Sequence, residues 1–326
     1  MLLRFGLSIL LLASPAAAQL LVVVNKTDHQ VALVDPATYA TVAKVPTGKG
    51  PHEVAVSPDG RFAYVSDYGS FMLSSGGGQQ PSGNSITVVD LKQRKAQATW
   101  PLGQYTQPHG IWVSRDGKLV WVTVEGSQTV LELEASSGKV LHAWKTGQRT
   151  SHMVVPTPDE KKLYVANIGS GSVTIVERAS GKVTSVPTGA GAEGVDDSPD
   201  GREVWVSNRA ADNISILSVA SDRILATLPS GGQVPIRLKF TPDGKQVLVS
   251  NARSNRVVIF DAQTRQKTGE VEVGSAPIGL LITPDGRRAF VANTDSHHVT
   301  VIDLSSRQVV KTFPTGQEPD GMAWAK

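Results

Sequence analysis

The stretch Pro51-His52-Glu53-Val54-Ala55-Val56-Ser57-Pro58-Asp59-Gly60 joins an alternating apolar run to a Ser-Pro-Asp-Gly turn. The same pattern returns six more times, with related turns after most copies. Its apolar fourth residue is, in order, Val54, Ile111, Val154, Val195, Leu238, Leu280 and Met322. The first step is 57 residues and the later steps are 41 to 43. A fixed period of this size predicts a repeat architecture.

Each repeat reads as four short strands. The leading strand is followed by a tight turn, in which Pro presets φ, Asp bonds the backbone and Gly takes a positive φ. In the first repeat the next strands are Phe62–Ser66, a run ending in Val88-Val89-Asp90, and a short run through Trp100 to Gly103. Strands at this spacing without a helical period predict an all-β fold. Four antiparallel strands per unit of about 42 residues predict a propeller blade.

The two ends of the chain predict how the ring closes. The mature chain starts with the second, third and fourth strands of a blade, the first of them at Leu20–Val24, and it ends with a leading strand at Gly321–Trp324. These pieces together complete a seventh blade and remove an exposed sheet edge. The sequence therefore predicts a seven-bladed β-propeller with 3+1 closure, formed as one domain by residues 19–326.

Residues 1–18 are predicted to be a signal peptide. Arg4 gives a positive start, Phe5–Ala13 is mostly apolar, and Ala16–Ala18 supplies small residues for cleavage before Gln19. We therefore expect a periplasmic or secreted protein. No other apolar run approaches the length of a membrane span, and a net charge of +3 with interspersed signs argues against nucleic-acid binding. The chain has no Cys, which excludes disulfides and thiolate sites.

A Gly/Ser-rich insertion at 68–84 separates the second and third strands of its blade. Long loops in an economical fold often carry function, here as a lid or partner contact. The alternative is a tolerated surface insertion.

The strand sequences resemble those of a known group of proteins. Leu163–Asn167, Val204–Asn208 and the Ser-Pro-Asp-Gly turns resemble the YVTN family of β-propeller repeat proteins, which are WD40-like in architecture. The closing segment Glu318–Trp324 looks like that of exported propellers associated with PQQ-dependent alcohol oxidation. The repeats also look distantly like the haem d1 propeller of nitrite reductases. The resemblance implies a propeller fold and leaves the function open.

Differences between the repeats point to a site. The second residue of the seven leading segments is His52, His109, His152, Glu193, Ile236, Ile278 and Asp320. These residues are expected to ring one mouth of the central channel, polar on five blades and apolar on two, as in a ligand site. Nearby departures from the repeat are Glu53, Asp196, Asp197 and Arg237. Arg237 either clamps an anionic ligand group or pairs with Asp196 or Asp197.

Several chemistries fit this mouth. His52, His109, His152 and Glu193 are candidate ligands of a divalent metal, if they converge to about 2.0–2.2 Å from one ion. In the structural alternative, each His bonds the backbone of the next loop and so fixes the ring. One His is also a candidate axial ligand of haem, although no Cys-x-x-Cys-His motif exists for covalent attachment.

The sequence leaves the function open among three classes. The first is an accessory protein that binds a small molecule, a cofactor or a periplasmic partner, in a redox or PQQ-linked oxidation system. The second is a metal-assisted hydrolase, lactonase or lyase that uses the His/Glu arc. The third is a protein that handles haem d1 or another tetrapyrrole. No catalytic residue is assigned, and a monomer is expected.

Overall fold

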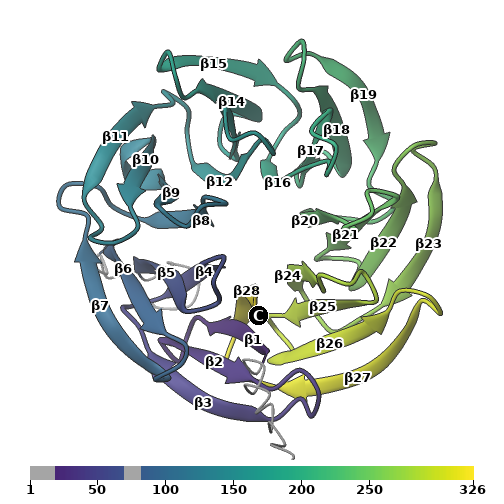
Figure 1. The fold of residues 1–326 in the computed structure, drawn as a ribbon. Coiled ribbons are helices and arrows are strands. Elements are labelled where there is room, and N and C mark those ends of the chain that lie inside the picture. The colour runs from purple at the N-terminus through teal and green to yellow at the C-terminus, as the bar shows by residue number, and fades with distance from the viewer. Residues whose placement is uncertain (1–18, 70–81) are drawn as a thin grey trace, which may run out of the picture.

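The computed structural model describes residues 19–69 and 82–326, so the predicted signal peptide and residues 70–81 of the insertion lie outside the described part. The strands form seven four-stranded antiparallel sheets around a central axis (Figure 1). The predicted seven-bladed propeller is therefore confirmed. One 3-10 turn, η1 (Glu125–Ser127), interrupts the strands of the described chain.

Within each sheet, the leading strand of the repeat lies nearest the axis, and the second, third and fourth strands follow it outward. The innermost strands are β4 (Pro51–Val56), β8 (Pro108–Val113), β12 (Ser151–Pro156), β16 (Ala192–Asp197), β20 (Pro235–Phe240), β24 (Pro277–Ile282) and β28 (Pro319–Ala325). The second strands are β1 (Leu20–Asn25), β5 (Phe62–Gly69), β9 (Leu119–Val124), β13 (Lys162–Asn167), β17 (Glu203–Asn208), β21 (Gln246–Asn251) and β25 (Arg288–Asn293).

The outer half of each sheet is formed by two further strands. The third strands are β2 (Gln30–Val34), β6 (Ser82–Asp90), β10 (Thr129–Glu134), β14 (Ser172–Glu177), β18 (Asn213–Ser218), β22 (Arg256–Asp261) and β26 (His298–Asp303). The outermost strands are β3 (Thr41–Pro46), β7 (Lys95–Pro101), β11 (Val140–Lys145), β15 (Lys182–Pro187), β19 (Ile224–Pro229), β23 (Lys267–Glu272) and β27 (Gln308–Pro314).

The ring closes in the predicted manner. Strand β28 pairs antiparallel with β1, placing Leu21 opposite Trp324 and Val22 opposite Ala323. The sheet order β28-β1-β2-β3 thus combines the last strand of the chain with the first three (Figure 1). This pairing covers the backbone edge that β1 would otherwise expose.

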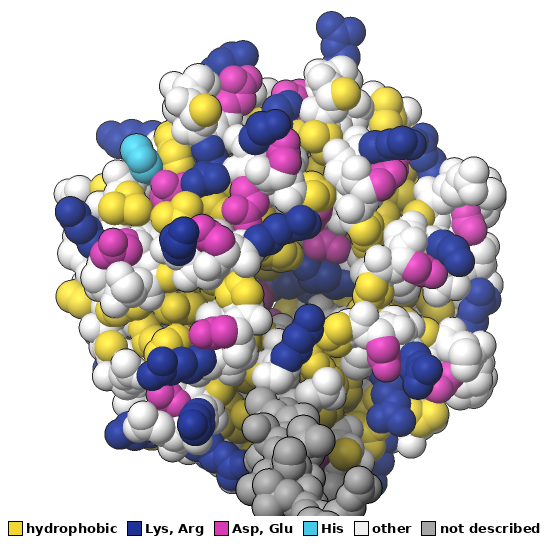
Figure 2. All heavy atoms as spheres, in the orientation of Figure 1, with side chains coloured by type: hydrophobic (Ala, Val, Ile, Leu, Met, Phe, Trp, Pro, Cys, Tyr) yellow, Lys and Arg dark blue, Asp and Glu magenta, His cyan; other side chains and the backbone are white. Residues whose placement is uncertain are grey.

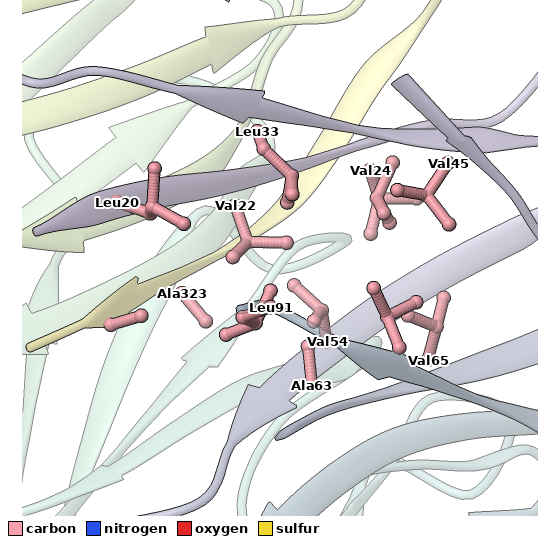
Figure 3. Packing of buried hydrophobic residues seen from close by; sticks show 13 residues of the cluster. Leu20, Val22, Val24, Leu33, Val45, Val54, Ala63, Val65, Leu91 and Ala323 are labelled. Atoms are coloured by element: carbon pink, nitrogen blue, oxygen red, sulfur yellow. The ribbon is translucent and has the colours of Figure 1, made fainter. Parts of the chain in front are cut away.

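Apolar side chains fill the seams between neighbouring sheets. Seven buried clusters lie among the described residues, one at each contact between adjacent sheets. The cluster in Figure 3 joins Val22 and Leu33 of the closing sheet to Val54 and Val65 of the next. The second and third strands are buried on both faces, which explains why their sequences are continuous apolar runs.

The ring is hollowed at its centre. In the view of Figure 2, Lys, Arg, Asp and Glu side chains gather in and around this hollow. Such charges need partners of opposite charge when they are buried. Within the described residues, no helix is long and apolar enough to cross a membrane.

A buried Asn ends the second strand of five sheets, and Asn167, Asn208 and Asn293 tie this strand to the third one. Asn167 Nδ2, for example, donates to Thr174 Oγ1 at 3.0 Å, and Asn208 Nδ2 donates to Ser215 Oγ at 2.9 Å. Asp67 takes this place in β5 and accepts hydrogen bonds from Ser85 Oγ at 2.8 Å and Thr87 Oγ1 at 2.9 Å. Burial nevertheless raises the pKa of Asp67 to about 6.

Replacing this carboxyl by the amide of the other sheets is expected to stabilise the protein. Because burial raises the pKa of Asp67, its protonated form is favoured in the fold, and this stabilisation is lost as pH rises through about 6. We expect Asp67→Asn to increase the free energy of unfolding by about 2 kcal/mol at pH 7.5, and by less at pH 5. Urea denaturation at both pH values measures this. Asp295→Asn at an exposed position is the control, and an equal gain at both pH values would contradict the explanation.

Candidate functional site

A bulge near the start of most innermost strands aims one side chain of each toward the axis. In β4 the register moves from Pro51 opposite Asp67 to Val54 opposite Val65, so the inner strand holds one extra residue. The freed amide of Glu53 donates to Ser66 Oγ at 3.1 Å. Equivalent bonds join Gly110 to Thr123, Gly194 to Ser207 and Arg237 to Ser250. Bulges re-aim side chains in this way, here those of the second residue.

Glycine at the third residue lets neighbouring inner strands approach closely. A Cβ on Gly110 would lie 2.6 Å from the carbonyl oxygen of His152, and one on Gly279 would lie 2.0 Å from that of Asp320. Glu53, Met153 and Arg237 occupy this position on three sheets.

The three predicted histidines come together as a buried stack. The His109 and His152 rings are 3.6 Å apart between centroids, and His52 lies 5.1 Å from His109. All three are at most 9 % exposed. His52 Nδ1 lies 2.9 Å from the carbonyl oxygen of Gly50, which belongs to the same loop as His52 rather than to the next loop. Nδ1 of His109 has no hydrogen-bond partner among the described residues.

His152 lies between two carboxylates. Its Nδ1 is 2.5 Å from Glu125 Oε1, and its Nε2 is 3.5 Å from Glu193 Oε1. Tyr68 Oη donates to the other oxygen of Glu125 at 2.8 Å, while Arg209 Nη1 lies 2.9 Å from Glu193 Oε2. The result is a continuous polar chain from Tyr68 to Arg209.

The pKa values of the three histidines diverge because their surroundings differ. Burial lowers the pKa of His52 to about 4, against the opposing charge of Asp320. Burial and the neighbouring His152 hold the pKa of His109 well below its usual value. Burial also acts on His152, but the carboxylates of Glu125 and Glu193 outweigh it and raise its pKa to about 9. At neutral pH, His152 is thus the charged member of the stack.

Arg237 forms an ion pair across the channel with Glu53. Strands β20 and β4 are three sheets apart around the ring, and the pair joins residues 184 positions apart. The structure therefore corrects the predicted pairing with Asp196 or Asp197, because the partner of Arg237 is Glu53. The alternative that Arg237 clamps an anionic ligand group stays a prediction. Against burial, the charge of Glu53 keeps the pKa of Arg237 above its usual value. Its Nη1 has no hydrogen-bond partner within the described chain.

Asp320 completes the polar part of the mouth. Its Oδ2 lies 3.2 Å from Lys26 Nζ, and its Oδ1 has no hydrogen-bond partner among residues 19–69 and 82–326. Although burial opposes it, the charge of Lys26 lowers the pKa of Asp320. Each carboxylate at the mouth therefore has a basic partner, in the pairs Glu53–Arg237, Glu125–His152, Glu193–Arg209 and Asp320–Lys26.

Asp196 is separate from this group. It lies three residues beyond Glu193, about 10 Å along β16. Its Oδ1 pairs with Lys239 Nζ at 2.7 Å, and its Oδ2 accepts a hydrogen bond from the Phe240 amide at 2.9 Å. The sequence groups Asp196 with the mouth residues. In the structure, its partners are instead Lys239 and the Phe240 amide.

Four further residues lie behind the ring of second residues, and the sequence-based predictions do not group them as a set. Lys26, Tyr68, Glu125 and Arg209 each directly follow the repeat position that Asn occupies in five sheets, which is filled here by Asn25, Asp67, Val124 and Asn208. All four touch the ring of second residues: Lys26 contacts Asp320, the Tyr68 ring is 4.5 Å from that of His52, and the other two bind His152 and Glu193. The signal was present, because they share one position of the 42-residue period.

The arrangement brings three possible metal ligands within reach of one another. One ligand atom each from His109, Glu125 and His152 lie within 4.8 Å of one another. This set shares two residues with the sequence-based set of His52, His109, His152 and Glu193. It differs by taking Glu125 in place of His52 and Glu193.

Comparison with protein families gives two matches. The model described as YNCE-like beta-propeller matches residues 106–284, and that of the SMP-30/Gluconolactonase/LRE-like region matches residues 25–169. A search of curated proteins found no significant match.

Solved structures share the fold at low sequence identity. Pseudomonas aeruginosa periplasmic gluconolactonase PpgL is 21% identical with a TM-score of 0.75, over 94% of this chain and 99% of that one. Kuenenia stuttgartiensis hydrazine synthase is 23% identical with a TM-score of 0.75, over 87% and 92%. Dihydro-heme d1 dehydrogenase NirN is 20% identical with a TM-score of 0.66, over 93% of this chain and 65% of that one. These likenesses show the fold, including the expected similarity to a haem d1 propeller.

The cross-channel pair makes a prediction about stability. Removing one member of a buried ion pair leaves the other charge without a partner, at a cost of about 3–5 kcal/mol. We expect Arg237→Met to destabilise the fold by this amount, and the double variant Glu53→Met/Arg237→Met to recover most of it. Chemical denaturation of the two single variants and the double variant measures the coupling.

Lys161→Met provides the matched control for this cycle, because Lys161 pairs with Asp159 at 3.1 Å on the surface. Exposed pairs contribute about 0–1 kcal/mol. Additive effects of the Glu53 and Arg237 substitutions would show that the two side chains are not coupled.

Proposed function

Because the chain belongs to the family of YNCE-like β-propellers, a fold that carries its function in sites placed on a common scaffold, we propose that it is an exported binding protein. Its ligand is a small polar molecule held at the channel mouth formed by the seven innermost strands, β4, β8, β12, β16, β20, β24 and β28. The predicted signal peptide supports export, as does the likeness to PpgL, a periplasmic protein. A periplasmic location is part of this proposal.

The observation that carries the proposal is a pair of buried polar atoms. Arg237 Nη1 and Asp320 Oδ1 are shielded from solvent and have no hydrogen-bond partner in the described residues. Leaving such a group unpaired costs about 1–3 kcal/mol, more when it is charged. A ligand that bonds to both atoms removes this cost. It would thereby gain affinity from groups that the fold has already positioned.

The charges of the mouth indicate what kind of molecule fits. Every mouth carboxylate is already paired with a basic side chain. A ligand with a net charge would therefore add a buried charge that has no partner of opposite sign. Arg237 Nη1 offers donors, whereas Asp320 Oδ1 offers an acceptor. Hydroxyl groups satisfy both kinds of partner. Ile236 and Ile278 give the mouth an apolar side. A small neutral hydroxylated molecule, such as a sugar or sugar lactone, matches these features.

A second candidate function is lactone hydrolysis. It is favoured by His152, which is held by Glu125 on one side and Glu193 on the other, an arrangement suited to moving protons. The match to the SMP-30/Gluconolactonase/LRE-like region, together with the likeness to PpgL, supports testing a lactone first.

The binding proposal predicts that the protein carries its ligand when purified from its native compartment. Denaturing the wild-type protein is expected to release about one small neutral molecule per chain, detected by mass spectrometry. The double variant Glu53→Met/Arg237→Met lacks Nη1 without leaving an unpaired charge, so it is expected to release none. A folded wild-type protein that releases nothing, and whose melting temperature neither D-glucose nor D-glucono-1,5-lactone raises, would refute the proposal.

The hydrolysis candidate predicts acid release from D-glucono-1,5-lactone above the spontaneous rate. Loss of a positioned acid–base group lowers such rates by about 10²–10⁴-fold, and we expect His152→Asn to do so. A pH-stat assay measures both proteins, with His142→Asn on the exposed strand β11 as control. If wild-type protein leaves the spontaneous rate unchanged, this candidate is eliminated and ligand binding remains.

A further inference from the structure

We propose that His109, Glu125 and His152 form a binding site for a divalent transition-metal ion of the zinc type. This inference deepens the proposed mouth site but uses different atoms from those that carry the ligand proposal. His109 and His152 are the second residues of the adjacent strands β8 and β12, and Glu125 opens η1 directly after β9. Two neighbouring sheets therefore supply all three donors.

Distance and burial support the site. The three possible donor atoms lie within 4.8 Å of one another. Donors around a tetrahedral zinc ion lie about 3.3 Å apart, which follows from bond lengths of about 2.0–2.2 Å. Binding an ion therefore requires the most distant donors of the set to approach one another by about 1.5 Å. The side chains of Glu125 and His152 are 8% and 11% exposed, and His109 is 3% exposed.

The unpartnered nitrogen of His109 is the independent observation that points to a ligand. Its ring is fully buried among His52, Tyr68 and His152, yet Nδ1 has no hydrogen-bond partner in the described chain. A buried imidazole nitrogen normally finds a partner. An ion bound to this lone pair supplies one.

The neighbouring groups are arranged as a second layer around such an ion. Glu193 Oε1 lies 3.5 Å from His152 Nε2, which leaves Nδ1 of that ring to face Glu125. A histidine that ligates a metal through one nitrogen usually donates its other N–H to a carboxylate or carbonyl. Tyr68 Oη binds Glu125 Oε2, so Oε1 remains directed at His152. The ion would replace the proton shared by Glu125 Oε1 and His152 Nδ1.

The donor set selects the class of metal. Two imidazoles and one carboxylate suit zinc and the other late first-row metals, whereas calcium and magnesium prefer oxygen donors throughout. Three protein donors leave a position for water or a ligand, as in catalytic rather than structural zinc sites. His52 is held by the Gly50 carbonyl. It therefore lies beside the ion without being needed as a donor.

Metal binding by the untagged chain 19–326 tests the inference, after removal of metals with a chelator and dialysis. Titration calorimetry with Zn²⁺ alone is expected to show one ion per chain. Co²⁺ is expected to give the visible absorption of a tetrahedral site with nitrogen and oxygen donors. His109→Ala and Glu125→Gln are expected to weaken Zn²⁺ binding at least 100-fold. Tyr68→Phe, which removes the hydroxyl that binds Glu125, is expected to weaken it about 10-fold.

His142→Asn is the matched control, because it removes an imidazole outside the proposed set. Circular dichroism establishes that each variant folds. If His109→Ala does not fold, the Zn²⁺ affinity of Glu125→Gln and the Co²⁺ spectrum of the wild-type protein decide whether the metal site exists. Unchanged Zn²⁺ affinity in either ligand variant, competition by millimolar Mg²⁺, or no binding by folded wild-type protein would overturn the inference. Since no organic ligand is added, failure here leaves the ligand proposal standing, and the reverse also holds.

Discussion

Backbone pairing between β28 and β1 holds the two ends of the chain together, and the geometry of the mouth depends on it. With this sheet complete, every innermost strand has a neighbour on each side, and apolar clusters can fill all of the seams. Asp320 on β28 then lies beside Lys26, which follows β1. Closure therefore assembles part of the mouth as well as the fold.

The closed ring makes it possible to bury charge. Taking a carboxylate or guanidinium out of water costs several kcal/mol unless a partner of opposite charge is close. At the mouth, each carboxylate has such a partner, and the partners come from several sheets. The Glu53–Arg237 pair spans the channel and so depends on the relative placement of β4 and β20. A rigid ring can hold that placement, whereas a pair of mobile loops would lose it.

The proposed ligand site and the proposed metal site use two different groups of atoms at the mouth. Arg237 and Asp320 offer unpaired hydrogen-bonding groups on one part of the ring, while His109, Glu125 and His152 form a compact donor set on another. Metalloenzymes use a similar arrangement, in which a metal ion activates or orients a molecule that other residues bind. The three neighbouring histidines arise because one repeat position carries the same residue on three consecutive sheets.

The number of sheets, the strand order and the closure can be predicted from the sequence, because each follows from a local pattern repeated at a fixed period. The same period assigns His52, His109, His152, Glu193 and Asp320 to one repeat position. The contacts between these side chains are visible only in the folded ring: Arg237 bonds Glu53 rather than Asp196, and Glu125 rather than Glu193 lies with the donor pair His109 and His152. The reason is geometric. A period states which residues occupy equivalent places, but bulges, side-chain reach and the angle between sheets decide which of them touch.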